Sequence, residues 1–263
     1  MIFRWLEHRR RRRLLATPFP DAWEPIVETL PCFATLDEHD RARLRDIARV
    51  IVAEKQWTGC AGLAIDDVIR VTIAAQAALL LVGLEHDYYR GVESIVVYPH
   101  TFEVPTRGAG PGGLAIEGKS AVLGLAHHGG TIVLAWDAVY HGAENFADGR
   151  NVVIHEFAHA LDLLDAWADG TPPLRNREQY DAWIRILGAE YERLVDHAER
   201  GRRAVLDSYG ATNPAEFFAV ATEAFFEKPR QLEREHGELY ALLTTYYGQD
   251  PAARVDPARR PTQ

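Results

Sequence analysis

Apolar positions recur at helical spacing along most of this 263-residue chain. From Leu36 to Trp57, and again from Gln179 to Arg200, they lie three or four positions apart between charged residues, which predicts two amphipathic helices. The stretch from Asp66 to Leu84 is more uniformly apolar and predicts a third helix. Because Arg70 and Gln76 interrupt that run, we interpret it as a buried core helix, and we expect no membrane span here or elsewhere.

Two short β-branched runs, Glu93–Tyr98 and Thr131–Trp136, predict strands. The glycine-rich stretch between them, Arg107 to Gly113, lacks the strand, helix and Lys-Ser/Thr of a phosphate loop, so we expect a flexible loop over a site. His127 and His128 are either metal ligands or loop residues, and we favour loop residues. The pattern as a whole predicts an α+β fold that is mostly α, with a small sheet.

A fourth predicted helix contains the candidate metal-binding and catalytic residues. Within Asn151–Asp162 the sequence reads His155-Glu156-Phe157-Ala158-His159. On an α-helix the two histidines lie roughly 40° apart and about 6 Å along the axis, so both imidazoles can reach one ion. Two neutral imidazoles suit Zn²⁺, and Glu156 beside them is placed to accept a proton from a bound water. The alternative is a pair of satisfied core histidines.

The residues around this motif favour a buried helix. Asn151 is expected to be its N-cap, and Asp162, seven residues after His155, returns to the ligand face, where it can orient an imidazole. The other positions are largely apolar: Val152, Val153, Ile154, Phe157, Ala158, Leu161, Leu163 and Leu164.

A catalytic zinc site usually needs a third protein ligand. The short continuation that would supply a third histidine six residues after His159 is absent, since that position holds Asp165. A carboxylate on a later helix is the remaining common solution. The best candidate segment is Tyr209–Glu227, in which Asn213 is expected to be the N-cap and Pro214 the first helical residue.

Two carboxylates lie seven residues apart on one face of that segment. Glu216 is the candidate ligand, although its position three residues after Asn213 also suits a capping box. Glu223 lies on the same face; the alternative interpretation is that it is an ordinary surface carboxylate. Two carboxylates on a helix so rich in Phe and Ala are costly to bury unless a positive charge lies near, and zinc would supply it.

Composition narrows the class of protein. A net charge of −9, from 29 basic and 38 acidic residues, argues against general nucleic-acid affinity. Cys32 and Cys60 are the only cysteines, so no disulfide framework is implied and a reducing, cytoplasmic location is expected. The metal ligands are therefore not thiolates.

The two ends of the chain differ from its middle. Residues 1–15 include five consecutive arginines and predict a solvated, partly disordered basic arm; association with an anionic membrane surface is the alternative. Residues 16–250 are predicted to form a single catalytic domain with an N-terminal helical part, and residues 251–263 a disordered tail.

The motif from His155 to Asp162, together with Tyr209, Asn213-Pro214-Ala215-Glu216-Phe217-Phe218 and Glu223-Ala224-Phe225-Phe226, resembles the Mlc titration factor A family. This family consists of cytosolic bacterial zinc metallopeptidases whose catalytic core is similar to that of the anthrax lethal factor. The resemblance spans most of residues 15–250. It implies a zincin-like core in which His155, His159 and Glu216 bind zinc, Glu156 is the catalytic base and Tyr209 aids the transition state.

The expected activity is therefore hydrolysis of peptide bonds, in the manner of an aminopeptidase, by a zinc-activated water. Tyr209 is our choice of donor to the oxyanion, and its alternative is a core tyrosine. We expect the peptide to lie along Thr131–Trp136 as an exposed strand edge. The family also takes its name from sequestering the glucose-regulating repressor Mlc, so a protein-binding regulator with a secondary zinc site is the rival function. Hydrolysis of a non-peptide amide is a third.

Overall fold

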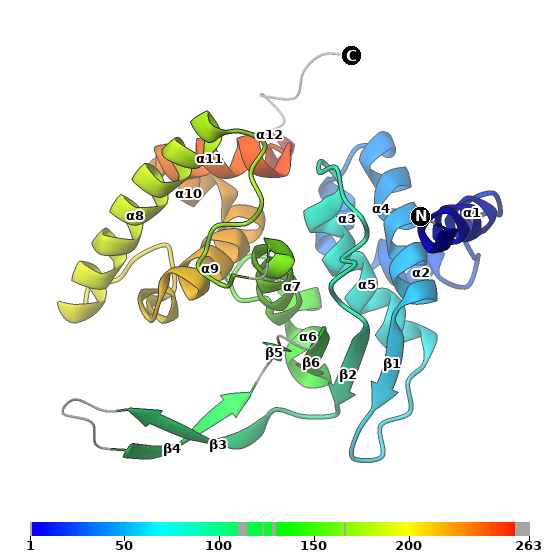
Figure 1. The fold of residues 1–263 in the computed structure, drawn as a ribbon, viewed down its shortest axis with the longest axis horizontal. Coiled ribbons are helices and arrows are strands. Elements are labelled where there is room, and N and C mark those ends of the chain that lie inside the picture. Colours follow the sequence, from blue (N-terminus) through cyan, green and yellow to red (C-terminus); the bar gives the residue numbers. More distant parts are fainter. Residues whose placement is uncertain (1, 110–114, 123, 128–129, 166, 256–263) are drawn as a thin grey trace.

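The computed structural model describes residues 2–109, 115–122, 124–127, 130–165 and 167–255. They are mostly helical with a small sheet, which confirms the predicted α+β class (Figure 1). No helix in this part of the chain is long and apolar enough to cross a bilayer. The helices are α1 (Ile2–Leu15), α2 (Glu24–Glu28), α3 (Pro31–Thr35), α4 (Glu38–Glu54), α5 (Asp67–Leu81), α6 (Trp136–Glu144), α7 (Val152–Asp162), α8 (Arg177–Glu199), α9 (Pro214–Glu227), α10 (Pro229–Glu235), α11 (Gly237–Tyr247) and α12 (Pro251–Val255), with short 3₁₀ turns η2 (Leu163–Asp165) and η3 (Ser208–Ala211).

The sheet consists of β1 (Gln56–Gly59), β2 (Ser94–Tyr98), β6 (Thr131–Ala135) and β5 (Gly124–His127), in that order. The first three strands are parallel, and β5 pairs antiparallel with β6. The predicted strands are thus present as β2 and β6. The expectation that Thr131–Trp136 is an exposed edge is wrong, because β6 pairs on both sides and β5 lies outside it.

Strand β1 lies where the sequence predicted the end of a helix. Helix α4 ends at Glu54, because Lys55 adopts an extended backbone and its ammonium donates to the carbonyls of Tyr89 and Val92, at 2.7 and 2.9 Å. The chain then enters the sheet beside β2.

A separate two-stranded hairpin is formed by β3 (Phe102–Ala109) and β4 (Ala115–Val122), which runs along the lower edge of Figure 1. The expected loop from Arg107 to Gly113 therefore begins as strand, since its first three residues pair within β3, and residues 110–114 lie outside the described residues. His127 ends β5, contrary to the expectation of a loop, and His128 is also outside the described residues.

The predicted helix starts are confirmed by their caps. Asp66 accepts a hydrogen bond from the amide of Ile69 at 2.9 Å at the start of α5, and Asn213 accepts one from the amide of Glu216 at 3.0 Å at the start of α9. Each cap satisfies an amide that the first turn leaves without a helical partner.

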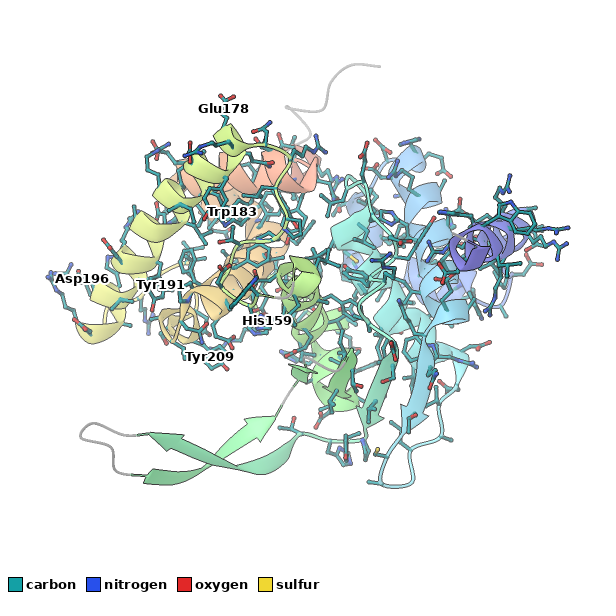
Figure 2. The ribbon with its side chains drawn as sticks, viewed as in Figure 1. His159, Glu178, Trp183, Tyr191, Asp196 and Tyr209 are labelled. Atoms are coloured by element: carbon teal, nitrogen blue, oxygen red, sulfur yellow. The ribbon has the colours of Figure 1, made fainter. Side chains whose placement is uncertain are left out.

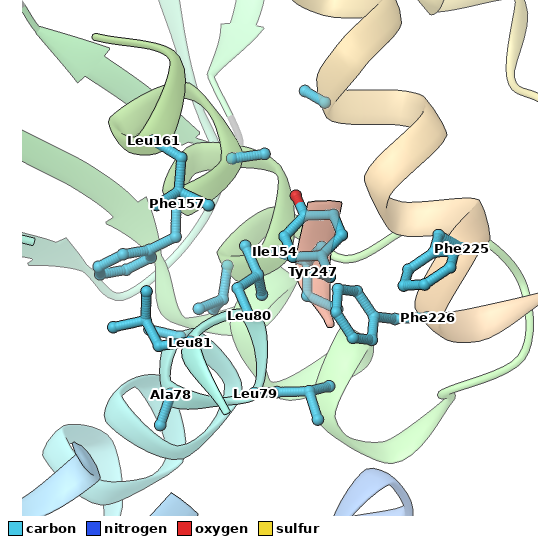
Figure 3. Close-up of a cluster of buried hydrophobic side chains, with 14 of the residues drawn as sticks. Ala78, Leu79, Leu80, Leu81, Ile154, Phe157, Leu161, Phe225, Phe226 and Tyr247 are labelled. Atoms are coloured by element: carbon cyan, nitrogen blue, oxygen red, sulfur yellow. The ribbon is translucent and has the colours of Figure 1, made fainter. Parts of the chain in front are cut away.

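The core forms where α5, α7, α9 and α11 meet. Figure 3 shows apolar side chains from all four helices packed together, and these side chains are almost completely buried. They include Ala78, Leu79, Leu80 and Leu81 of α5, Ile154, Phe157 and Leu161 of α7, Phe225 and Phe226 of α9, and Tyr247 of α11. Packing of this kind fixes α7 against α9, and these two helices carry the candidate site.

The two ends of the chain are more ordered than expected. Residues 2–15 form helix α1 instead of a partly disordered arm, because Arg11 is buried and forms ion pairs with Glu54 and Asp87. Residues 251–255 form α12, in which Ala252 is buried and donates its amide hydrogen to the Tyr240 hydroxyl at 2.9 Å. Only residues 256–263 of the predicted tail lie outside the described residues.

Candidate metal centre

Helix α7 is anchored at its first turn by Asn151, as predicted. The side-chain oxygen of Asn151 accepts hydrogen bonds from the amides of Val153 and Ile154, both at 3.1 Å. Its side-chain nitrogen donates to Gln76 of α5 at 2.8 Å and to the carbonyl of Gly142 at 3.2 Å. Because Asn151 is buried, these bonds tie the start of the motif helix to the core.

The two motif histidines share one face of α7. The ring centroids of His155 and His159 are 4.9 Å apart, and both side chains are largely buried. The apolar background is confirmed for Val153, Ile154, Phe157, Ala158 and Leu161, which are buried. Leu164 differs: it lies past the end of α7 in η2, where its side chain is exposed.

Glu216 reaches this face from the first turn of α9. One of its carboxylate oxygens, Oε2, lies 3.0 Å from Nε2 of His155 and 3.3 Å from Nε2 of His159. The ligand atoms of the three residues all lie within 4.8 Å of one another. The Glu216 carboxylate is therefore directed at the imidazoles, while only its backbone amide takes part in the N-cap.

Glu223 lies on the same face of α9 as Glu216, seven residues further along the helix. Its Oε1 lies 2.7 Å from Nδ1 of His155, and its Oε2 accepts a hydrogen bond from the backbone amide of Asn151 at 2.5 Å. The side chain is buried, so the interpretation as a surface carboxylate is wrong. Its seven-residue spacing from Glu216 was the available signal, but the partner on α7 cannot be deduced from spacing.

The electrostatics of these groups are strongly coupled. Burial disfavours the charged imidazole of His155, yet its hydrogen bonds with Glu216 and Glu223 outweigh burial and raise its pKa to about 10. Burial likewise works against ionised Glu216, but hydrogen bonds from His155 and His159 lower the pKa of its carboxyl group to about 2. The cluster therefore favours a negative carboxylate next to a positive charge.

Asp162 does not orient an imidazole, as the sequence predicted it would. Its Oδ2 accepts a hydrogen bond from the amide of Gly170 at 2.9 Å, and its Oδ1 has no hydrogen-bond partner in the described part of the chain. Burial is the main reason that its pKa is raised, to about 6. Gly170 has a φ of +81°, and its carbonyl accepts from the Trp183 indole at 2.9 Å. Asp162 therefore stabilises the loop after α7 and does not contact an imidazole.

The two predicted catalytic residues line a common pocket of about 740 Å³. Glu156 is buried at the pocket wall. Tyr209 lies in η3 with its side chain 55% exposed, and its ring centroid is 6.0 Å from that of His155. Figure 2 shows Tyr209 and His159 on neighbouring elements in the middle of the molecule. A side chain this exposed is not part of the core, which argues against the alternative that Tyr209 is a core tyrosine.

An ion pair that the sequence does not predict lies at the rim of this pocket. Arg150 donates from Nη2 and Nε to Oδ2 of Asp207, at 2.8 and 3.0 Å, and both residues line the pocket. Asp207 also accepts a hydrogen bond from the amide of Tyr209 at 2.9 Å, so the pair connects the loop before α7 to η3. The two residues are 57 positions apart, so no local sequence pattern predicts their contact.

Comparison with known proteins places the sequence of this chain in a family. The sequence model of the family described as glucose-regulated metallo-peptidase M90 matches residues 5–248. An uncharacterized protein of Synechocystis sp. is 38% identical over 250 residues, which are 94% of this chain and 90% of that protein. The Mlc titration factor A proteins of Serratia proteamaculans and Yersinia pestis are 32% and 31% identical over 254 residues, covering 95% of this chain and 94% and 91% of those proteins.

Proposed function

Because this chain belongs to the family of glucose-regulated metallopeptidases M90, we propose that it is a zinc-dependent, aminopeptidase-like enzyme with a zincin-like core. His155, His159 and Glu216 are the proposed zinc ligands. The observation that carries the proposal is the position of Glu216 Oε2, which lies within 3.3 Å of the Nε2 atoms of both motif histidines although 57 or more residues separate them in sequence.

The residues fit a zinc ion by their chemistry. Two imidazole nitrogens and one carboxylate make a three-ligand set of the kind that leaves a fourth position open in catalytic sites. The Nδ1 atom of His155 is engaged by Glu223, so its Nε2 atom is the one available to a metal. The low pKa of Glu216 provides a negative charge that offsets the charge of the ion.

The proposed catalysis divides the work between the ion and two side chains. When bound, zinc supplies a Lewis acid that acidifies water and polarises a carbonyl group. Glu156, next to His155 in α7, accepts the proton of the attacking water and returns it to the leaving amine. Tyr209 donates its hydroxyl hydrogen to the oxygen on which negative charge develops. Partial desolvation, together with the nearby carboxylates of Glu216 and Glu156, raises the pKa of Tyr209, so the hydroxyl is protonated at neutral pH.

The substrate in this proposal is a peptide or protein held in extended form. Strand β5 is the outermost strand of the sheet on the side of β6, and it packs next to α7. An extended peptide can add to such an edge through main-chain hydrogen bonds, which demand little of its sequence. We therefore move the proposed substrate edge from β6 to β5.

A second function is favoured by the relatives. Proteins named Mlc titration factor A are 31–32% identical over 95% of this chain. We infer from this that the chain also binds and sequesters an Mlc-like transcriptional repressor, and a cytoplasmic location follows from that role. Cys32 and Cys60 are both free thiols, which supports a reducing compartment.

Glu156→Gln separates the two functions. Hydrolysis of a panel of aminoacyl anilides should fall at least 100-fold, because the amide cannot act as a base, while zinc content and repressor binding stay unchanged. A variant that keeps full hydrolysis contradicts the assigned base. A wild-type protein that binds zinc and repressor but hydrolyses neither anilides nor peptides would instead be a binding protein, and one that hydrolyses only small acyl amides would be a non-peptide amidase.

A further inference from the structure

The N-terminal helix α1 is fixed to the body by one side only. Arg11 is buried there: its Nε and Nη2 atoms donate to Glu54 of α4, both at 2.8 Å, and its Nη1 donates to Asp87. Its guanidinium carbon also lies 4.5 Å from the centroid of the Tyr88 ring. On the same side, Arg49 donates to the carbonyl of Leu14. The helix is therefore held in one orientation, and its opposite side faces solvent.

The solvent side of α1 combines arginines with large apolar side chains. At roughly 100° per residue, Trp5, Leu6, Arg9, Arg12 and Arg13 fall within about 120° of the helix circumference, opposite Arg11. All five are exposed; Trp5 is 54% and Leu6 is 48% accessible. We call these five residues the outer face of α1.

The arginines of the outer face are not neutralised by the protein. Among the described residues, no carboxylate forms an ion pair with Arg9, Arg12 or Arg13, and the guanidinium of Arg9 lies 5.4 Å from the centroid of the Trp5 ring. Residues 2–15 hold six of the 29 basic residues of a chain whose net charge is −9. Positive charge is therefore concentrated on one helix of an otherwise acidic protein, where it can orient the molecule toward an anionic surface.

The position of α1 suits such a surface. It lies at the opposite end of the longest molecular axis from α8 (Figure 1), and the side chains of its outer face are exposed. Among the described residues, none of α1 lines the pocket that contains Glu156 and Tyr209. A bilayer in contact with the outer face would therefore leave that pocket open.

The mixture of residues favours a lipid surface over a nucleic acid. A cluster of arginines on a helix surface is attracted to anionic lipid headgroups, and tryptophan is enriched at the interface between membrane and water. There the aromatic ring and the aliphatic stems of arginine enter the headgroup region while the guanidinium groups stay at the phosphates. A nucleic acid would engage the arginines but offers no apolar phase to Leu6.

We propose that the outer face of α1 binds reversibly to an anionic lipid bilayer, with Trp5 and Leu6 at headgroup depth. The surface potential of anionic lipids contributes roughly fivefold in binding for each arginine near the membrane. The three arginines of the outer face therefore account for about a 100-fold preference for anionic over neutral bilayers.

The test is co-sedimentation of the full-length chain with vesicles of phosphatidylcholine alone and of phosphatidylcholine with phosphatidylglycerol in equal parts. The wild type is expected to sediment only with the anionic vesicles. Replacing Arg9, Arg12 and Arg13 together by Gln should weaken this binding about 100-fold. The matched control replaces Arg177, Arg185 and Arg200 by Gln, which removes the same charge from the exposed surface around α8 and should change binding little.

Fluorescence locates the helix in the bilayer. Lipids with brominated chains should quench the intrinsic tryptophan fluorescence of the wild type, and Trp5→Phe should abolish this quenching without preventing sedimentation. Thermal unfolding and anilide hydrolysis of every variant should match the wild type, which shows that the chain is folded.

Three results would overturn the proposal. Equal sedimentation with neutral vesicles would deny the charge preference, and an equal loss in the α8 control would deny the role of α1. Failure to bind anionic vesicles while a single-stranded RNA is bound through Arg9, Arg12 and Arg13 would assign the outer face to a nucleic acid.

Discussion

Glu223 joins the ring of His155 to the backbone at the start of the motif helix. One carboxylate oxygen is 2.7 Å from Nδ1 of His155, and the other is 2.5 Å from the backbone nitrogen of Asn151. Because Glu223 engages Nδ1, a ring that gives up one proton keeps the other on Nδ1 and has its lone pair on Nε2, which faces Glu216. The position of one buried side chain thus sets both the tautomer and the direction of the first proposed ligand.

We expect Glu223→Gln to weaken zinc binding about tenfold and Glu223→Ala about 100-fold, because the first keeps a hydrogen-bond acceptor without its charge and the second keeps neither. Competition with a fluorescent zinc chelator measures both affinities. Glu192→Gln, which changes an exposed carboxylate on α8, is the matched control. Affinity equal to that of the wild type in both Glu223 variants would show that Glu223 does not orient the ligand.

Tyr209→Phe removes a hydroxyl and leaves a ring that lies 6.0 Å from His155, measured between the ring centroids. The kcat for an aminoacyl anilide should fall about 100- to 1,000-fold, as for the loss of one oxyanion donor, while KM and zinc content stay near wild-type values. Steady-state kinetics with zinc analysis of the same samples test this. The role of Tyr209 in the transition state would be refuted by an unchanged kcat, or by a loss that follows loss of zinc.

Zinc uptake should release protons. The pKa of about 10 for His155 means that in the metal-free chain this ring is protonated at neutral pH, whereas a ligating nitrogen must give up its proton. We expect about one proton released per zinc bound near pH 7, and an affinity that rises about tenfold per pH unit below the pKa. Calorimetric titrations in buffers of different ionisation enthalpy measure the count. Release of no proton would contradict the charged ring.

Ionisation of Glu227 makes the stability of the folded chain depend on pH. Its Oε2 accepts hydrogen bonds from the amides of Gly149 and Arg150, at 2.8 and 3.0 Å, and burial is the main reason that its pKa is raised from 4.5 to about 8. Because the pKa is higher in the folded chain than in the unfolded one, its contribution to stability is complete below about pH 4.5 and is lost as the pH rises toward 8.

Glu227→Gln cannot ionise but can still accept hydrogen bonds from both amides. The thermal midpoint of this variant in the metal-free state should therefore equal that of the wild type near about pH 5 and exceed it above about pH 8. Unfolding followed by circular dichroism across this range measures the difference. Parallel profiles for the two proteins would show that Glu227 is not held neutral by burial.

The sequence predicted α4, α5, α7, α8 and α9 because the signals of these helices are local. Asp66, Asn151 and Asn213 mark helix starts within three residues of the amides that they cap. The small sheet was only half predicted: β2 and β6 are β-branched runs, whereas Gln56–Gly59 and Gly124–His127 are too short and too poor in such residues to predict a strand. Their strand character comes from pairing with β2 and β6.

The site was predicted as far as spacing within one helix allows. His155, Glu156 and His159 share a helix, and Glu216 and Glu223 share another, but the contact between the two helices depends on packing. For that reason the role of Glu223 was missed and the orienting role was assigned to Asp162. The same limit applies to Arg11, one of five consecutive arginines, whose partners Glu54 and Asp87 are 43 and 76 residues away.

The central claim is that His155, His159 and Glu216 bind one zinc ion, and metal analysis by mass spectrometry tests it most directly. Wild-type protein, Glu216→Ala and the surface control Glu192→Ala would be stripped, incubated with zinc and desalted together. We predict about one zinc per chain in the wild type and the control, and less than about a tenth of that in Glu216→Ala. No zinc in the wild type, or an equal amount in Glu216→Ala, would contradict the proposed centre.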